Sequence, residues 1–339
     1  IVLINPPVAK PSEPPAGIAR LAGFLRQNDI DCRVIDANIG GLDFLLSRPV
    51  PAEDTWTRRA VKNRSRHLTA LQGRSGYTNF DRYKRAVADI GRVLEKAEPN
   101  QRVKIGLANY QDRDLSPVRS QDLLRAAARP ETNPFYDYYR KAILPAAMDP
   151  AIAAVGISLG FLSQALCGFA LIGLLKRERA DLDIILGGGL MTSWMRRLDW
   201  RNPFGELVDH MVAGPGEEAL MNLLGKPGDP RSFLPDYSDF EKNRYFSPGF
   251  ILPYSASSGC YWHRCSFCPE RAEKNPWQPI PVSRVAAELK QLVNRYHPVC
   301  VHLLDNAVSP ALLRALAAEP LNVPWYGFVR FNRQLEDLD

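Results

Sequence analysis

Short apolar runs alternate with amphipathic stretches along the start of the chain. Residues 1–5 form an apolar run that ends before two prolines, which predicts a buried strand followed by an extended loop. Residues 18–27 repeat apolar side chains at helical spacing, and residues 32–36 form a second apolar run. A strand, a helix and a strand in this order predict a βαβ unit with parallel strands and a right-handed crossover.

The same alternation resumes after residue 150. Five parallel strands separated by helices predict an α/β fold with a doubly wound, Rossmann-like parallel sheet. Ligands of such sheets bind beyond the carboxyl ends of the strands. The later strands are predicted at 153–158, 183–186 and 210–213, with helices at 163–179, after the glycine triplet 187–189, and from 214 to about 225.

An insert interrupts the alternation between about residues 42 and 150. Helical patterns at 83–97 and 120–128, a short strand near 103–108 and several prolines predict mostly helical decoration. Residues 48–104 carry 14 Lys and Arg against 6 Asp and Glu, so this stretch has a net charge of +8 within a chain total of +6. Solvated basic faces of amphipathic helices explain this excess, and a surface for nucleic acid or acidic ligands is the alternative.

The length of 339 residues and the apolar content of 45% favour two domains. We expect the first over residues 1–225 and the second over residues 254–339. Between them, residues 226–253 are rich in Pro, Gly, Asp and Ser, which predicts a linker.

The chain has neither a membrane segment nor a secreted disulfide framework in its sequence pattern. No apolar run approaches the roughly 20 residues that span a bilayer, and the apolar start lacks the features of a signal peptide. Cys32, Cys167 and Cys300 stand singly in apolar segments, as buried thiols do. We therefore expect a cytoplasmic protein.

The second domain begins with a predicted strand at 254–257, and a loop with three cysteines follows it directly. Cys260, Cys265 and Cys268 lie within nine residues. Three thiolates on one loop suit an iron–sulfur cluster, whose fourth iron would then be open to a ligand. A zinc ion completed by His263 is the alternative, although such zinc sites usually have a second cysteine pair farther along the chain.

Two further β/α repeats follow the cysteine loop. The pattern predicts helices at 282–295 and 310–318 and strands at 300–304 and 325–329. Because carboxyl ends of parallel strands share one edge, the residues after these strands should face the same mouth as the cysteines.

The cysteine loop resembles the cluster loop of radical S-adenosylmethionine (SAM) enzymes, through Gly259, the three cysteines, Phe267 before the third and Pro269 after it. This resemblance implies a [4Fe–4S] cluster, SAM chelated at the open iron, and cleavage of SAM to a 5′-deoxyadenosyl radical. The usual family spacing is C-x3-C-x2-C, whereas here it is C-x4-C-x2-C. One extra residue must bulge between Cys260 and Cys265.

By the same resemblance, Phe267, Asp305, Asn306 and Arg330 are candidates for binding SAM. Asp305 and Asn306 would reach its amino group or ribose, and Arg330 its carboxylate or a substrate anion. Alternatively, these side chains cap the next helix or pair with each other. The glycine-glycine-glutamate patch common in the family is absent from this position of the sequence.

The first half resembles the cobalamin-binding domain that precedes many radical SAM barrels. It shares Ile-Asn-Pro-Pro, Pro-Pro-Ala-Gly-Ile, Ile-Asp-Ala-Asn, a glycine triplet and Gly-Pro-Gly-Glu-Glu in the same order. There is no D-x-H-x-x-G motif to supply a histidine ligand for cobalt, and a scaffold without cofactor is the alternative. The residues implied for cobalamin binding are Asn5, Pro6, Pro7, Ser158, Gly187, Gly188, Gly189, Gly214 and Glu217.

Together the resemblances imply a cobalamin-dependent radical SAM enzyme that transfers a methyl group to an unactivated carbon or phosphorus of a small-molecule or natural-product substrate. Ring contraction or rearrangement is equally compatible, and the reductant would be a flavodoxin or ferredoxin. The alternatives are an RNA methylthiotransferase, for which Cys32 and Cys167 are too sparse a second cysteine set, and a zinc-bearing binding module. Radical SAM barrels usually have six or more repeats, so we expect a chain truncated at its C-terminal end.

Overall fold

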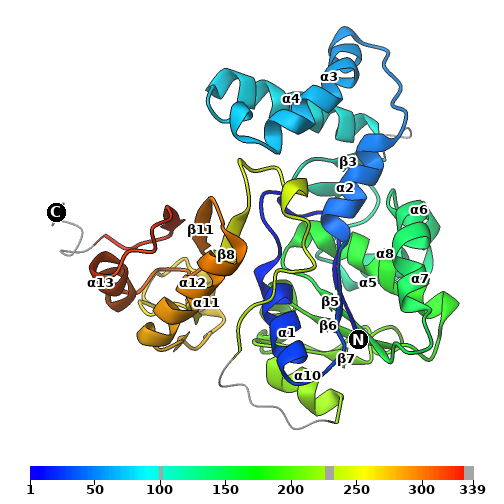
Figure 1. The fold of residues 1–339 in the computed structure, drawn as a ribbon. Coiled ribbons are helices and arrows are strands. Elements are labelled where there is room, and N and C mark those ends of the chain that lie inside the picture. Colours follow the sequence, from blue (N-terminus) through cyan, green and yellow to red (C-terminus); the bar gives the residue numbers. More distant parts are fainter. Residues whose placement is uncertain (99–101, 226–232, 332–339) are drawn as a thin grey trace. The chain divides into compact units, whose positions relative to one another are not determined.

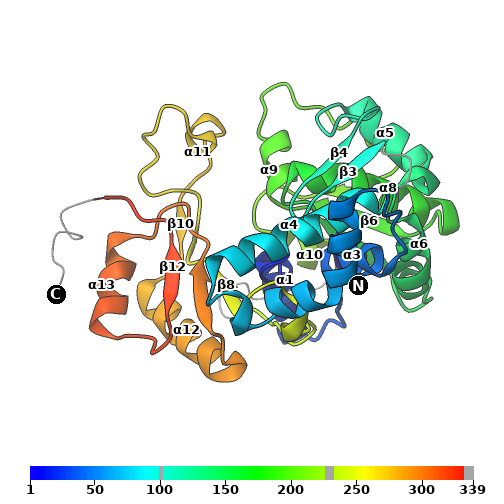
Figure 2. The same cartoon turned by 90° about the horizontal axis from the view of Figure 1, so that it is seen from above.

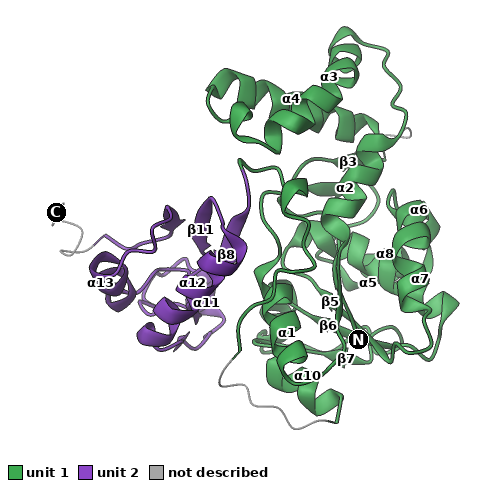
Figure 3. Cartoon of the chain, in the orientation of Figure 1, with its two compact units in different colours: residues 1–248 green, residues 249–339 purple. Residues whose placement is uncertain are grey.

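The computed structural model describes residues 1–98, 102–225 and 233–331. These residues form two compact units, Ile1–Pro248 and Gly249–Asp339 (Figure 3). The boundary lies within the linker that the sequence predicts at 226–253 and differs from both expected domain limits.

The first unit is built on a five-stranded parallel sheet, as the sequence predicts. The strand order is β2-β1-β5-β6-β7, and Ile4 of β1 pairs with Ile35 on one side and Ile157 on the other. The central strands are buried along nearly their whole length, because helices cover both faces of the sheet. The strands are β1 (Val2–Asn5), β2 (Arg33–Asp36), β5 (Ala154–Ser158), β6 (Asp183–Gly187) and β7 (His210–Met211).

Helices α1 (Ala16–Gln27) and α10 (Glu217–Leu223) lie on one face of this sheet, and α8 (Leu162–Glu178) lies on the other (Figure 1). Every residue of α8 from 164 to 175 is buried, since α5 (Ser120–Ala128) packs on the side away from the sheet. The short helix α9 (Gly189–Met195) follows β6.

The insert is largely helical, and the helices expected at 83–97 and 120–128 are confirmed, as is a strand at 103. Helices α3 (Thr55–Leu71) and α4 (Phe80–Lys96) form a helical hairpin. The side chains of Asp54 and Asn79 cap the N-termini of α3 and α4, respectively. Its other elements are α2 (Ala37–Ser47), η1 (Arg74–Gly76), β3 (Val103–Ile105), β4 (Tyr110–Asp112), η2 (Pro130–Thr132), α6 (Tyr136–Tyr138), η3 (Tyr139–Ile143) and α7 (Leu144–Ala147). Figure 2 shows the antiparallel β3–β4 hairpin beside α5 and α8.

Residues 233–248 belong to the first unit and pack against the rest of it, which corrects part of the predicted linker. The amide of Asp236 donates to the carbonyl of Ala19 (2.8 Å), and Arg26 pairs with Asp236 (2.8 Å). The composition of this segment is typical of a linker, but its aromatic side chains supply enough apolar area to hold it in place. Those buried side chains are Phe233, Tyr237, Phe240, Tyr245 and Phe246.

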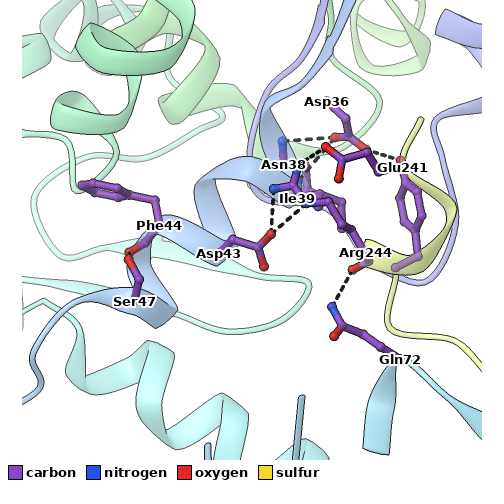
Figure 4. A network of polar contacts seen from close by, with 10 residues as sticks. Asp36, Asn38, Ile39, Asp43, Phe44, Ser47, Gln72, Glu241 and Arg244 are labelled. Atoms are coloured by element: carbon purple, nitrogen blue, oxygen red, sulfur yellow. Dashed lines mark hydrogen bonds and ion pairs between the residues drawn. The ribbon is translucent and has the colours of Figure 1, made fainter. Parts of the chain in front are cut away.

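A polar network ties the end of this segment to the insert (Figure 4). Arg244, at the end of η4 (Lys242–Arg244), donates to Asp43 of α2 at 3.0 and 2.7 Å. The Arg244 carbonyl accepts from Gln72 Nε2 at 3.1 Å, just beyond α3. The segment therefore links α2 to the end of α3.

The second unit contains a three-stranded parallel sheet of order β12-β11-β8, formed by β8 (Ile251–Tyr254), β11 (Cys300–Leu303) and β12 (Trp325–Gly327). Helices α12 (Val282–Tyr296) and α13 (Pro310–Ala318) bury leucines against it. The described part of this unit is a parallel β/α sheet, and a closed barrel is not seen in it.

The first strand of this unit starts three residues earlier than the sequence predicts. Pro253 lies inside β8, where its missing N–H is tolerated because β8 pairs on one side only among the described strands. Of the residues expected as the strand, Tyr254 ends β8 and the next ones leave the sheet, where β9 (Ser257–Ser258) pairs antiparallel with β10 (Gln278–Pro279). Across the described ranges, none of the helices combines the length and the apolar character needed to cross a bilayer.

Candidate functional site

The cysteine loop follows β8 and begins near the carboxyl end of this strand. Its base is closed by the β9–β10 ribbon, in which Ser258 pairs with Gln278. Gly259 follows at φ +71°, and a Cβ added to it would lie 2.4 Å from the Pro276 carbonyl oxygen. Only glycine fits there, so Gly259 fixes how the chain enters the loop.

Hydrogen bonds within the loop give it a defined conformation. His263 Nε2 lies 2.9 Å from the Glu270 carbonyl and donates to it, and the amide of Cys268 donates to the Cys265 carbonyl (3.3 Å). The short helix α11 (Pro269–Ala272) starts after Cys268, with proline at its first position. Figure 2 shows this loop projecting beyond the strands of its unit.

Cys260, Cys265 and Cys268 are free, partly exposed thiols on this one loop. No group of three His, Cys, Asp or Glu side chains among the described residues is close enough to hold a metal ion. The donor chemistry fits an iron–sulfur cluster, and the loop must contract to bring its three sulfurs together. Glu270 Oε2 on the same loop is buried without a hydrogen-bond partner among the described residues.

Asp305 and Asn306, which follow β11, brace the start of the cysteine loop. Asp305 is 3% exposed and accepts from the amide of Ala256 (3.0 Å) and from Ser257 Oγ (2.5 Å). Asn306 Nδ2 donates to the Gly259 carbonyl at 3.4 Å. The alternative role considered for these two residues was to cap the next helix. Ser309 has that role, since its Oγ accepts from the Leu312 amide of α13.

Arg330 and Phe267 are also positioned at this end of the sheet. The Arg330 guanidinium lies over the ring of Trp262 with its carbon 3.2 Å from the ring centroid, so the segment after β12 contacts the loop. Phe267 is 88% exposed. The strand ends therefore gather three of the four side chains predicted for SAM around the loop, and Phe267 lies on the loop itself.

Removal of the Asp305 carboxylate is expected to destabilise the second unit. Asp305→Ala leaves the Ala256 amide and the Ser257 hydroxyl without their acceptor in a buried place, which costs about 2 kcal/mol. Hydrogen exchange of peptides from β8 and β11 measures this loss. Ser257→Ala removes one of the two hydrogen bonds and should cost about 1 kcal/mol. Equal exchange in wild type and Asp305→Ala would contradict a stabilising role of these bonds.

Alkylation of the reduced chain should separate the loop thiols from Cys32 and Cys167. Burial raises the pKa of the Cys32 thiol to about 11, and that of Cys167 farther still. At pH 8 the thiolate fraction of Cys32 is then about a hundredfold below that of an ordinary thiol, and its labelling should accelerate as the pH rises toward 11. Peptide mass spectrometry after iodoacetamide should show the three loop cysteines labelled before Cys32 and Cys167, and early labelling of Cys167 would contradict this prediction.

At the carboxyl edge of the first sheet, Asn5 belongs to a polar network. Its Nδ2 donates to Asp36 Oδ1 and its Oδ1 accepts from Gln164 Nε2, both at 2.9 Å. Gln164 also donates to the Pro6 carbonyl at 2.7 Å. Tyr245 donates to Asp36 at 2.7 Å, yet burial raises the pKa of that carboxyl above its usual value.

Gln164 also belongs to this edge, although the sequence pattern did not predict it. Its signal is an amide side chain in the first turn of a helix whose middle is apolar. Gln164 Oε1 accepts from the amides of Gly160 and Phe161 at 2.8 and 3.0 Å, so one side chain links the ends of β1 and β5. Pro7 lies close to α2, where a Cβ added at Gly41 would be 3.6 Å from its ring.

In the glycine triplet after β6, one position is required for close packing and another is exposed. Gly188 has φ +102°, and a Cβ added there would lie 2.4 Å from the Leu159 carbonyl oxygen. Gly187 pairs with Ser158 in the sheet. Gly189 is exposed, with the nearest atom 3.7 Å from an added Cβ, so its backbone can be approached by a ligand.

Gly214 and Glu217, predicted at the same edge, have different surroundings. Gly214 has φ +81° and open space within 4 Å of an added Cβ, and its amide donates to Thr192 Oγ1 at 2.9 Å. Glu217 is buried and paired with Arg20 of α1. Glu217 therefore joins α10 to α1.

Comparisons with family models, curated proteins and solved structures found no match to this chain.

Proposed function

We propose that this chain belongs to a radical SAM enzyme whose [4Fe–4S] cluster is held by Cys260, Cys265 and Cys268. The observation that carries this proposal is three free thiols on one loop after the first strand of a parallel β/α unit. When bound, the cluster supplies an open iron for SAM and the electron that cleaves it to a 5′-deoxyadenosyl radical. Parallel β/α enzymes have their chemistry at this end of the strands.

The surrounding residues have roles that suit this proposal. Asp305 and Asn306 hold the entry of the loop, so they act on the cysteines through its backbone. Arg330 covers Trp262 and places a positive charge beside the loop, where it would attract the SAM carboxylate. Phe267 presents an exposed ring between two cysteines, which would stack on a flat base.

Anaerobic reconstitution with iron and sulfide tests the cluster directly. We expect about four irons per chain and, after reduction, an electron paramagnetic resonance signal that changes when SAM is added. The control is the same chain loaded with zinc. Stoichiometric zinc with no iron uptake and no SAM-sensitive signal would reject the enzyme in favour of a zinc-bearing binding module.

The hydrogen bond of His263 does not separate the cluster from zinc, because Nε2 donates to a backbone carbonyl and Nδ1 can still bind a metal. An RNA methylthiotransferase has less support, because Cys167 is fully buried and half of any second cysteine set would be inaccessible.

Cobalamin in the first unit is the second part of the proposal, with methyl transfer to an unactivated carbon or phosphorus of a small molecule as the reaction. A strand order with its switch between β1 and β5, the exposed Gly189 and the open space beside Gly214 support a ligand at this edge. Asn5 and Glu217 bind other side chains and would contribute through the backbone they position. Titration with hydroxocobalamin, followed by the absorption change of the bound corrinoid, tests this part separately.

A further inference from the structure

A hollow of about 470 Å³ opens in the first unit between the β3–β4 hairpin and the start of α8. It is lined by residues 109–117, by Arg119 and Asp122 of the following loop and helix, and by Leu162 and Ser163. The residues expected to bind cobalamin do not contribute to it. Its volume suits a small metabolite.

The hollow lies beside the switch point of the sheet. In the order β2-β1-β5-β6-β7 the chain leaves β1 toward one edge and β5 toward the other, and ligands bind beyond the strand ends between them. Ser163 follows β5 and donates from Oγ to the Val8 carbonyl beyond β1 at 2.7 Å. Residues of the insert therefore line one side of the region where such sheets bind ligands.

The uncommitted charges in this lining are mainly positive. Arg113 and Arg119 are exposed, and their guanidinium groups have no hydrogen-bond or ion-pair partner within the described ranges. The lining also holds three carboxylates, but Asp112 lies 3.8 Å from Arg102 and Asp122 pairs with Arg125 at 3.0 Å, and both of these arginines lie outside the lining. Among the described residues, Asp114 is the acidic side chain of the lining without such an ion pair.

We propose that this hollow binds an organic phosphate through Arg113 and Arg119. Guanidinium groups match phosphate oxygens in bidentate geometry, and two of them on one short loop favour a dianionic group. Leu162 is 43% exposed and offers an apolar surface for the organic part of the ligand. This site depends on neither the cysteine loop nor the proposed radical chemistry.

Titration calorimetry with inorganic pyrophosphate at constant ionic strength tests the site on the full chain. We expect saturable binding that weakens at least tenfold in the double variant Arg113→Gln/Arg119→Gln. The matched control, Arg58→Gln/Arg66→Gln, removes the same charge from exposed positions of α3 and should bind as wild type does. Asp114→Asn should bind a few times more tightly, because it removes a repelling carboxylate.

Three results would overturn the proposal. Undetectable pyrophosphate binding by the wild type would reject a phosphate site. Unchanged affinity in the Arg113→Gln/Arg119→Gln variant would place the binding elsewhere. Equal weakening in the α3 control would mean attraction to overall positive charge, and circular dichroism of each variant excludes misfolding as the cause of a loss.

Discussion

Replacement of any one of Cys260, Cys265 and Cys268 by alanine is expected to abolish most of the iron uptake of the reconstituted chain. Two sulfurs and the loop backbone cannot hold three irons of a cubane, so the loss should be nearly complete for each single variant. The reduced protein should then lack the SAM-sensitive resonance signal. Iron and sulfide analysis beside the spectrum measures both effects.

The matched control for these variants is Cys32→Ala. Cys32 is a half-buried thiol outside the loop, so its loss should leave iron uptake and the signal unchanged. Similar losses in Cys32→Ala and in the loop variants would indicate nonspecific iron binding. Full iron content in all three loop variants would contradict the proposal that these cysteines hold a cluster.

The order of elements in the first unit could be predicted because its strands are short apolar runs bounded by turns. Residues 1–5, 32–36, 153–158 and 183–186 each coincide with a strand to within one or two residues. The packing of residues 233–248 could not be predicted, because Pro, Asp and Ser in that segment indicate a linker while a few aromatic side chains determine the outcome. Burial of such a side chain depends on a partner surface that is distant in sequence.

The site shows the same division. Three cysteines, a preceding glycine and the polar residues after two strands were visible in the sequence, since strand ends meet at one edge. The contacts of Asp305 were not, because the carboxylate is committed to Ala256 and Ser257, about 50 residues earlier in the chain. Hydrogen-bond partners across a sheet depend on strand register. The first strand of the second unit was predicted to begin three residues too late in the sequence, so its partners could not be predicted.

The glycines of the first unit distinguish tight packing from open space, and this has a consequence for stability. Gly173→Ala in α8 is expected to destabilise the first unit by about 3 kcal/mol or more, even though alanine is the better helix former. A Cβ added there would lie 1.9 Å from the Ala127 carbonyl oxygen and 2.5 Å from its carbon. Because these are backbone atoms of α5, no side-chain rotation relieves the overlap, and the two helices must separate.

Gly91→Ala is the control for this prediction, since Gly91 also lies inside a helix and an added Cβ has no atom within 4 Å. Its helix propensity gain of about 1 kcal/mol should appear undiminished. Hydrogen exchange of α8 and α4 peptides measures the two changes separately, with faster exchange in α8 for Gly173→Ala and slower exchange in α4 for Gly91→Ala. Slower exchange in α8 for Gly173→Ala would contradict the close contact between α5 and α8.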